Sequence, residues 1–104
     1  MQIRRVTPDE RAQMKQKQEH LFMATMEMLH DSDPVGIGHI EDEYDLEAAD
    51  IAVNLHQCAT LEEIRTLCYE VFLLWFSKEL AADVLDIPLE RFAYILDLVR
   101  ADKS

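Results

Sequence analysis

The chain has 104 residues, of which 49% are apolar and 30% are charged, a composition typical of one globular domain with a single core. It contains only two glycines and three prolines, which disfavours an all-β sandwich or barrel and favours a few long helices. Twenty-one acids against ten bases give a net charge of −11, and a field of that sign repels DNA, RNA and anionic membranes. We therefore predict one all-α domain, residues 1–104, that binds neither nucleic acid nor a membrane directly.

The compartment is predicted from apolar runs and cysteines. No run approaches the roughly eighteen apolar residues of a membrane-spanning helix, and no apolar signal region follows the first arginines. Cys58 and Cys68 fall on apolar helix faces, where free thiols indicate a reducing compartment. We expect a cytoplasmic protein.

The first predicted helix covers residues 8–30. Thr7 can cap it, Pro8 suits the first helical position, and Glu10 completes a capping box with Thr7. The Asp33-Pro34 pair stops it, because a residue before proline resists helical geometry. The apolar residues that recur at helical spacing are Met14, Leu21, Phe22, Met28 and Leu29.

Two further helices are predicted at 45–58 and 61–76. Asp45 is a good N-cap for the first of them, and Thr60 with Glu63 forms a capping box for the second. The helix at 61–76 is apolar over much of its circumference, which predicts a central helix with neighbours on several sides. Trp75 and Phe76 are interpreted as core residues of that helix.

The remaining chain predicts a short helical piece near 78–85 and a last helix at 88–101. Leu80, Val84 and Leu85 are expected to point inward from the short piece, and Pro88 fits a first turn. The whole is predicted to be a bundle of four main helices with short connections.

No pattern in the sequence indicates catalysis. The chain lacks a nucleophile motif, a phosphate-binding glycine loop and a dinucleotide fingerprint. The four histidines have neither metal-site spacing nor a neighbouring nucleophile and base: His20, His30, His39 and His56. We expect no enzyme activity, no cofactor and no metal.

One stretch copies part of a calcium-binding loop. Asp31, Asp33, Gly36 and Asp42 match the first, third, sixth and twelfth positions of such a loop. Val35 stands at the fifth position, where an oxygen donor is needed, so we do not predict that this stretch binds calcium.

Acidic residues are concentrated in the first half of the chain. Residues 18–64 contain no Lys or Arg and twelve acids, eight of them within 31–50. One interpretation is a solvated loop leading into a helix whose N-terminus favours carboxylates such as Asp45 and Glu47. The other is a carboxylate patch, with Tyr44 as an aromatic anchor, that contacts Lys or Arg of a partner.

Residues 33–76 resemble a group of small bacterial helical proteins. The shared features are the run Asp33-Pro34-Val35-Gly36-Ile37, the run Asp42-Glu43-Tyr44-Asp45, and the pair Trp75-Phe76 that ends a helix. The group includes immunity proteins of contact-dependent growth inhibition and other polymorphic toxin systems, and helical domains of unknown function. The resemblance implies an acidic inhibitor that covers the active site of a basic toxin domain, such as a nuclease.

We therefore predict an antitoxin-like immunity protein whose acidic surface binds and neutralises a basic toxin. The residues predicted to contact the partner are Glu41, Asp42, Glu43, Tyr44, Asp45, Glu47 and Asp50. The alternative is a small helical regulatory or ligand-binding module, dimeric through exposed Met23, Met26 and Leu73. An enzyme built from scattered acids and histidines is a third hypothesis, which a deep pocket holding His20, His39 or His56 beside a carboxylate would favour.

Overall fold

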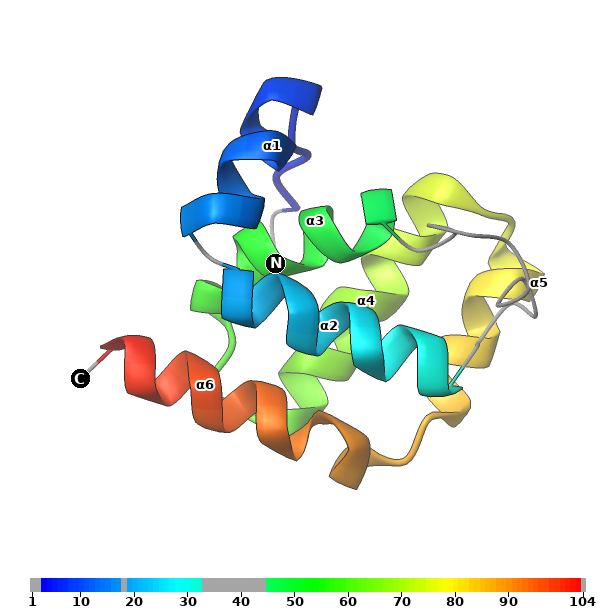
Figure 1. Ribbon diagram of the computed structural model, residues 1–104. Helices are drawn as coiled ribbons and strands as arrows, with labels where there is room; N and C mark the ends of the chain where they lie inside the picture. The colour runs from blue at the N-terminus through cyan, green and yellow to red at the C-terminus, as the bar shows by residue number, and fades with distance from the viewer. Residues whose placement is uncertain (1–2, 18, 33–44, 104) are drawn as a thin grey trace.

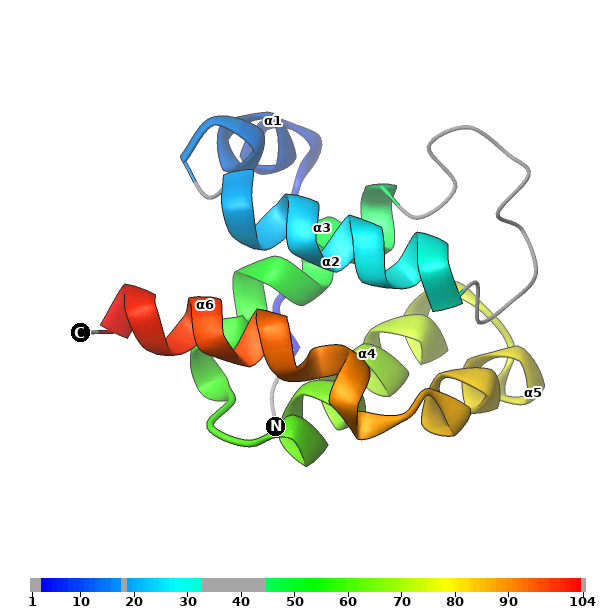
Figure 2. The same cartoon turned by 60° about the horizontal axis from the view of Figure 1, so that its bottom comes forward.

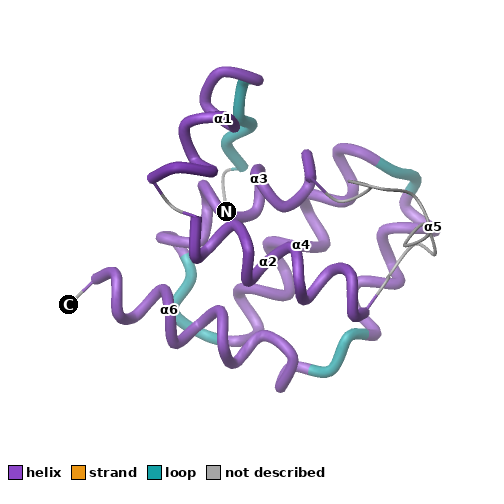
Figure 3. The backbone as a smooth tube through the Cα atoms, viewed as in Figure 1, coloured by secondary structure: helices purple, strands orange, loops and turns teal. Residues whose placement is uncertain are grey.

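The structure, a computed structural model, describes residues 3–17, 19–32 and 45–103, and within these ranges the chain forms helices and no β-strand (Figure 3). The all-α prediction is confirmed for this part of the chain. No helix in these ranges combines the length and the apolar character needed to cross a bilayer. The α-helices are α1 (Pro8–Lys17), α2 (Glu19–Ser32), α3 (Asp45–Asn54), α4 (Leu61–Trp75), α5 (Lys78–Ala81) and α6 (Ala93–Lys103), and the 3-10 helices are η1 (Leu55–Gln57), η2 (Ala82–Asp86) and η3 (Leu89–Phe92).

The single helix predicted at 8–30 is two helices, α1 and α2, which run in different directions (Figures 1 and 2). The difference follows from the distribution of apolar residues. Helix α1 is polar around most of its circumference, so it has no apolar face to align with that of α2. Helix α2 buries Leu21, Phe22, Met28 and Leu29, which are four of the five apolar residues that suggested one long helix.

Helix α4 is central, as its broad apolar surface predicts: it contacts α3, α5, η2, η3 and α6. Helices α2 and α6 lie side by side across one face of the molecule, and α5 lies at one end (Figures 1 and 2). The other predicted helices are found with small shifts, since 45–58 ends as η1 and 88–101 begins as η3.

The core joins side chains from every element between α2 and α6. Its largest fully buried side chains are Phe72 and Phe92, from α4 and η3. The buried apolar residues of α4 recur at helical spacing, which accounts for its central place: Ile64, Leu67, Cys68, Val71 and Phe72.

Both predicted capping boxes are present. The Thr7 hydroxyl accepts a hydrogen bond from the Glu10 amide, and the Glu10 carboxylate accepts one from the Thr7 amide, both at 3.2 Å. At α4, the Thr60 hydroxyl accepts from the Glu63 amide at 3.1 Å, while the Glu63 carboxylate reaches the Ala59 amide at 2.9 Å. These bonds satisfy backbone donors that a helix start leaves without partners.

The prediction for the 78–85 piece is right for Val84 and wrong for two leucines. Val84 is fully buried, whereas Leu80 and Leu85 are 44% and 43% exposed. The stretch is a single turn of α-helix, α5, followed by η2 with its three-residue period. Side chains spaced for one continuous α-helix therefore do not share a face.

Candidate partner-binding surface

The predicted partner-binding residues fall into three groups. Glu41, Asp42, Glu43 and Tyr44 lie outside the described residues. Asp45 is the first residue of α3. Glu47 and Asp50 are only 5% and 1% exposed, so the prediction that these two form an acidic surface is wrong.

Helix α3 buries both carboxylates because it is packed against α1, α2 and α4. Its residues from Glu47 to Ala52 are all buried. A surface helix would show solvent-exposed residues in each turn, and α3 offers none over this stretch. A carboxylate at such a position needs hydrogen-bond partners within the protein.

Asp50 receives these partners from distant parts of the chain. Its Oδ1 accepts a hydrogen bond of 2.9 Å from the Val6 amide, and its Oδ2 accepts one of 2.9 Å from Nε1 of Trp75. The Nε of Arg5 lies 3.8 Å from the same Oδ2, and the Arg5 guanidinium lies over the Trp75 ring, 4.7 Å from its centroid. Trp75 is partly buried, and it donates a hydrogen bond to Asp50 in addition to packing against the core.

Asn54, one turn after Asp50 on α3, ties down the same N-terminal segment. Its Oδ1 accepts from the Arg4 amide at 3.0 Å, and its Nδ2 donates to the Arg4 carbonyl and the Asp50 carbonyl, both at 2.8 Å. Backbone groups of Arg4 and Val6 are therefore both bound by side chains of α3, which holds this segment against the helix. Helical spacing puts Asn54 and Asp50 on one face to receive them.

A separate hollow, which we call the acidic hollow, lies at the C-terminal end of α2. It has a volume of about 360 Å³, and its walls come from the end of α2, from η2, from the link between η2 and η3, and from η3. The lining residues are Asp31, Ser32, Asp83, Asp86, Ile87, Pro88 and Arg91.

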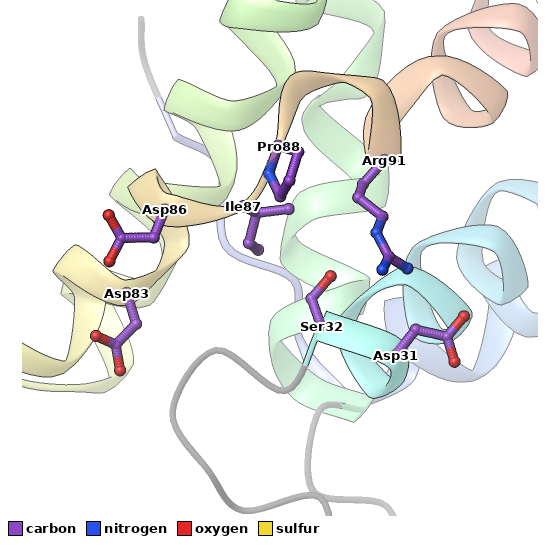
Figure 4. A pocket seen from close by; sticks show the side chains of 7 residues that line it. All are labelled: Asp31, Ser32, Asp83, Asp86, Ile87, Pro88 and Arg91. Atoms are coloured by element: carbon purple, nitrogen blue, oxygen red, sulfur yellow. The ribbon is translucent and has the colours of Figure 1, made fainter.

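Figure 4 shows how the charged side chains of the acidic hollow are arranged. The Arg91 guanidinium extends toward the side where Asp31 and Ser32 lie, while the Asp83 and Asp86 carboxylates lie together on the opposite side. Asp31, Asp83, Asp86 and Arg91 are all exposed. Among the described residues, no ion pair engages Asp83 or Asp86. This side of the hollow is therefore available to cationic groups of a ligand or partner.

Asp83 and Asp86 were not among the predicted site residues. They lie some fifty residues after Asp31, in a stretch interpreted only as a short helical piece. The available signal was the aspartate pair three residues apart, which helical geometry puts on one face. Its approach to Asp31 depends on how η2 packs on α4 and α5, which sets its place relative to the end of α2 and which local sequence does not encode.

A smaller and more apolar hollow of about 180 Å³ lies between α2, α3 and α6. His56 and Asp102 line it, and Nε2 of His20 is 3.1 Å from Oδ1 of Asp102. A histidine beside a carboxylate in a pocket is what the enzyme hypothesis required, but none of the described residues that line this hollow is a Ser, Cys or Lys. The other lining residues are Leu21, Ala52, Val53, Leu55 and Val99.

The cysteines are buried free thiols, as expected from their apolar surroundings. Burial raises the pKa of the Cys68 thiol far above its ordinary value, and the neighbouring Cys58 raises it further. Within the described ranges, no three His, Cys, Asp or Glu side chains are arranged to hold a metal ion.

Comparison of the chain with protein-family models, with curated proteins and with solved structures finds no match. The resemblance to immunity proteins therefore stays a prediction.

Proposed function

We propose that this protein binds a basic segment of a partner protein at the acidic hollow, and that it acts as an immunity protein that neutralises a basic toxin domain. The observation that carries the proposal is the set of exposed aspartates, Asp31, Asp83 and Asp86, around one hollow. With a net charge of −11, such a surface attracts cations and accelerates encounter with a basic partner.

The acidic hollow also has the composition of a protein-binding site. Pro88 supplies exposed apolar surface between the charged groups, and the buried Ile87 lies beside it in the wall of the hollow. Leu85, which is 43% exposed, lies in the same 3-10 helix as Asp83 and Asp86. Apolar contact area provides binding energy, while the carboxylates select a basic partner and set the association rate.

Sequence continuity joins this hollow to the acidic residues of the first prediction. Asp31 and Ser32 immediately precede the 33–44 stretch, which carries four further acids, Asp33, Glu41, Asp42 and Glu43. A partner that contacts both would meet at least seven carboxylates. A basic nuclease domain, whose substrate groove is lined with Lys and Arg, suits a surface of this kind.

The test compares two charge-reversed variants of equal net charge. Asp83→Lys/Asp86→Lys reverses two acids of the acidic hollow, and Glu62→Lys/Asp97→Lys reverses two exposed acids of α4 and α6 that do not line it. Each tagged protein is used to capture partners from an extract of its source cells at low and high salt. We expect wild type and control to retain a basic protein at low salt and release it at high salt, and the hollow variant to lose it.

The captured protein is then expressed in a test host with each variant. Protection of the host by wild type and control, and none by the hollow variant, is the expected result for an immunity protein. Equal capture by all three proteins would exclude the hollow as the binding surface. If the captured basic protein does not harm the host, the proposed partner binding would stand and the proposed immunity function would be wrong.

The apolar hollow beside His56 favours a second candidate function, a small-ligand module. Its 180 Å³ accommodate a group of a few non-hydrogen atoms, with Asp102 and His56 available for hydrogen bonds. Val53→Trp would fill it. A ligand that mass spectrometry finds in the gently purified wild-type protein should be absent from Val53→Trp. If both proteins carry the ligand equally, this hollow is not its binding site.

A further inference from the structure

The Asp50 carboxylate and the Trp75 indole together have the chemistry of a guanidinium-binding site. A carboxylate oxygen provides the charge-assisted hydrogen bond, and an indole face is the best aromatic surface for a cation. In this protein the two groups are held together by the 2.9 Å bond between Nε1 of Trp75 and Oδ2 of Asp50. Asp50 is 1% exposed, so its position is fixed and its field is little screened.

Arg5 occupies this site loosely. Its guanidinium lies 4.7 Å from the Trp75 centroid, a good stacking distance, but its Nε is 3.8 Å from Oδ2 of Asp50, longer than a hydrogen bond. The Arg5 side chain is 48% exposed. The contact is therefore electrostatic, open to solvent on one side, and replaceable.

The N-terminal segment does not depend on this contact for its position. The backbone of Arg4 is held by Asn54, and the Val6 amide is held by Asp50. The Arg5 side chain can therefore leave while the segment on either side of it stays bound.

A hollow of about 160 Å³ lies against the same two groups. Apolar surface from Val6, Pro8 and Leu46 lines it together with Asp50 and Trp75. Its apolar walls suit the aliphatic stem of an arginine, whose head would then meet the carboxylate and the indole.

We propose that Asp50 and Trp75 form a receptor for an arginine side chain of a partner protein, and that Arg5 fills this receptor until the partner's arginine replaces it. This site is separate from the acidic hollow. The intramolecular arginine acts as a tethered competitor, so only a partner that presents arginine in a favourable setting gains access. In this proposal Asp50 meets the partner's arginine as a buried anchor of one site and not, as first predicted, as part of an acidic surface.

The test uses the full chain and the fluorescence of Trp75, which is its only tryptophan. Wild type, Arg5→Ala and the control Arg100→Ala, which removes an exposed arginine from α6, are titrated with N-acetyl-arginine amide. N-acetyl-citrulline amide, of nearly the same shape but uncharged, is the matched control ligand. Far-UV circular dichroism and urea midpoints establish that each variant is folded.

We expect a saturable fluorescence change for Arg5→Ala with the arginine probe and none with the citrulline probe. Wild type and Arg100→Ala should bind about tenfold more weakly, because the tethered Arg5 competes. Adding Asp50→Asn to Arg5→Ala should abolish binding. Free L-arginine should bind no more tightly than the amide, since none of the described residues that line the hollow carries a positive charge to pair with an α-carboxylate.

Three results would overturn the proposal: no saturable change in folded Arg5→Ala, equal responses to arginine and citrulline, or equal affinity of wild type and Arg5→Ala. Tighter binding of free L-arginine than of the amide would refute a protein partner. None of these measurements involves Asp83 or Asp86, so failure here leaves the function proposed for the acidic hollow standing, and the reverse also holds.

Discussion

The indole of Trp75 on α4 donates a hydrogen bond of 2.9 Å to the buried carboxylate of Asp50 on α3, and so joins two helices through one polar contact. Trp75→Phe keeps an aromatic ring but removes this donor, and so takes one hydrogen bond from the Asp50 carboxylate, which is almost without access to water. We expect a loss of about 1–3 kcal/mol in the free energy of unfolding, measured by urea titration with circular dichroism. Tyr94→Phe, which also removes one polar group but from a residue that is 62% exposed, should change stability little. If Trp75→Phe and Tyr94→Phe lower the free energy of unfolding equally, the hydrogen bond from Trp75 to Asp50 does not contribute to stability.

Asn54 provides a sharper test of how the N-terminal segment is held. Asn54→Asp preserves size but replaces the two donor bonds of Nδ2 with a carboxylate that faces the carbonyls of Arg4 and Asp50. We expect a destabilisation of about 3 kcal/mol or more, because a buried charge is left facing acceptors. Gln57→Ala removes only a neighbouring exposed side chain that donates to Asn54, and should cost much less.

The same segment should show an alternating pattern of amide exchange. The Arg4 and Val6 amides are bonded to side chains of α3, whereas the described residues supply no acceptor for the Arg5 amide. Hydrogen exchange followed by NMR should therefore find Arg4 and Val6 protected and Arg5 fast. In Asn54→Asp the Arg4 amide should lose its protection, and uniform fast exchange in wild type would contradict the docked arrangement.

The start of α4 allows a test of capping with two identical substitutions. Thr60→Ala removes the hydroxyl that accepts from the Glu63 amide and should cost about 1 kcal/mol. Thr66→Ala makes the same chemical change at an exposed position inside α4, where alanine has the higher helix propensity. Urea midpoints should fall for the first variant and stay level or rise for the second.

The buried thiol of Cys68 predicts a loss of stability at alkaline pH. Its pKa is raised in the folded protein, so the folded thiol stays protonated while that of the unfolded chain ionises above its ordinary pKa of 9.0. This contribution is fully present below pH 9 and is lost as pH rises further. Urea midpoints between pH 7 and pH 10 should fall at the alkaline end. Cys68→Ala should be less stable throughout but should show a smaller fall, and an unchanged slope would contradict the assignment.

Signals within three or four residues were readable from the sequence. The boxes at Thr7 and Thr60 were predicted correctly because donor and acceptor lie in one turn. The breadth of the apolar surface predicted the central place of α4. The same periodicity failed at residues 8–30, because Met14 was the one apolar residue of that set in α1, and helical spacing alone cannot show whether two segments share an axis.

The candidate sites were less predictable because their partners are distant in the sequence. Asp50 was expected on the surface, as an acid near a helix start usually is. Its burial depends on Val6, 44 residues earlier, and on Trp75, 25 residues later. The acidic hollow likewise exists only once η2 lies beside the end of α2, which brings Asp83 and Asp86 near Asp31.

The docking of Ile3–Thr7 on α3 also has a consequence for protein synthesis. Arg4 is bonded to a residue 50 positions later, so the backbone of this segment leaves the ribosome well before Asn54 of α3, the side chain that binds it. The Arg5 side chain contacts Trp75, so its partner is synthesised later still, with α4. This segment is thus synthesised before the helices that bind it, and Arg4 and Arg5 cannot reach their contacts on α3 and α4 until those helices have been translated.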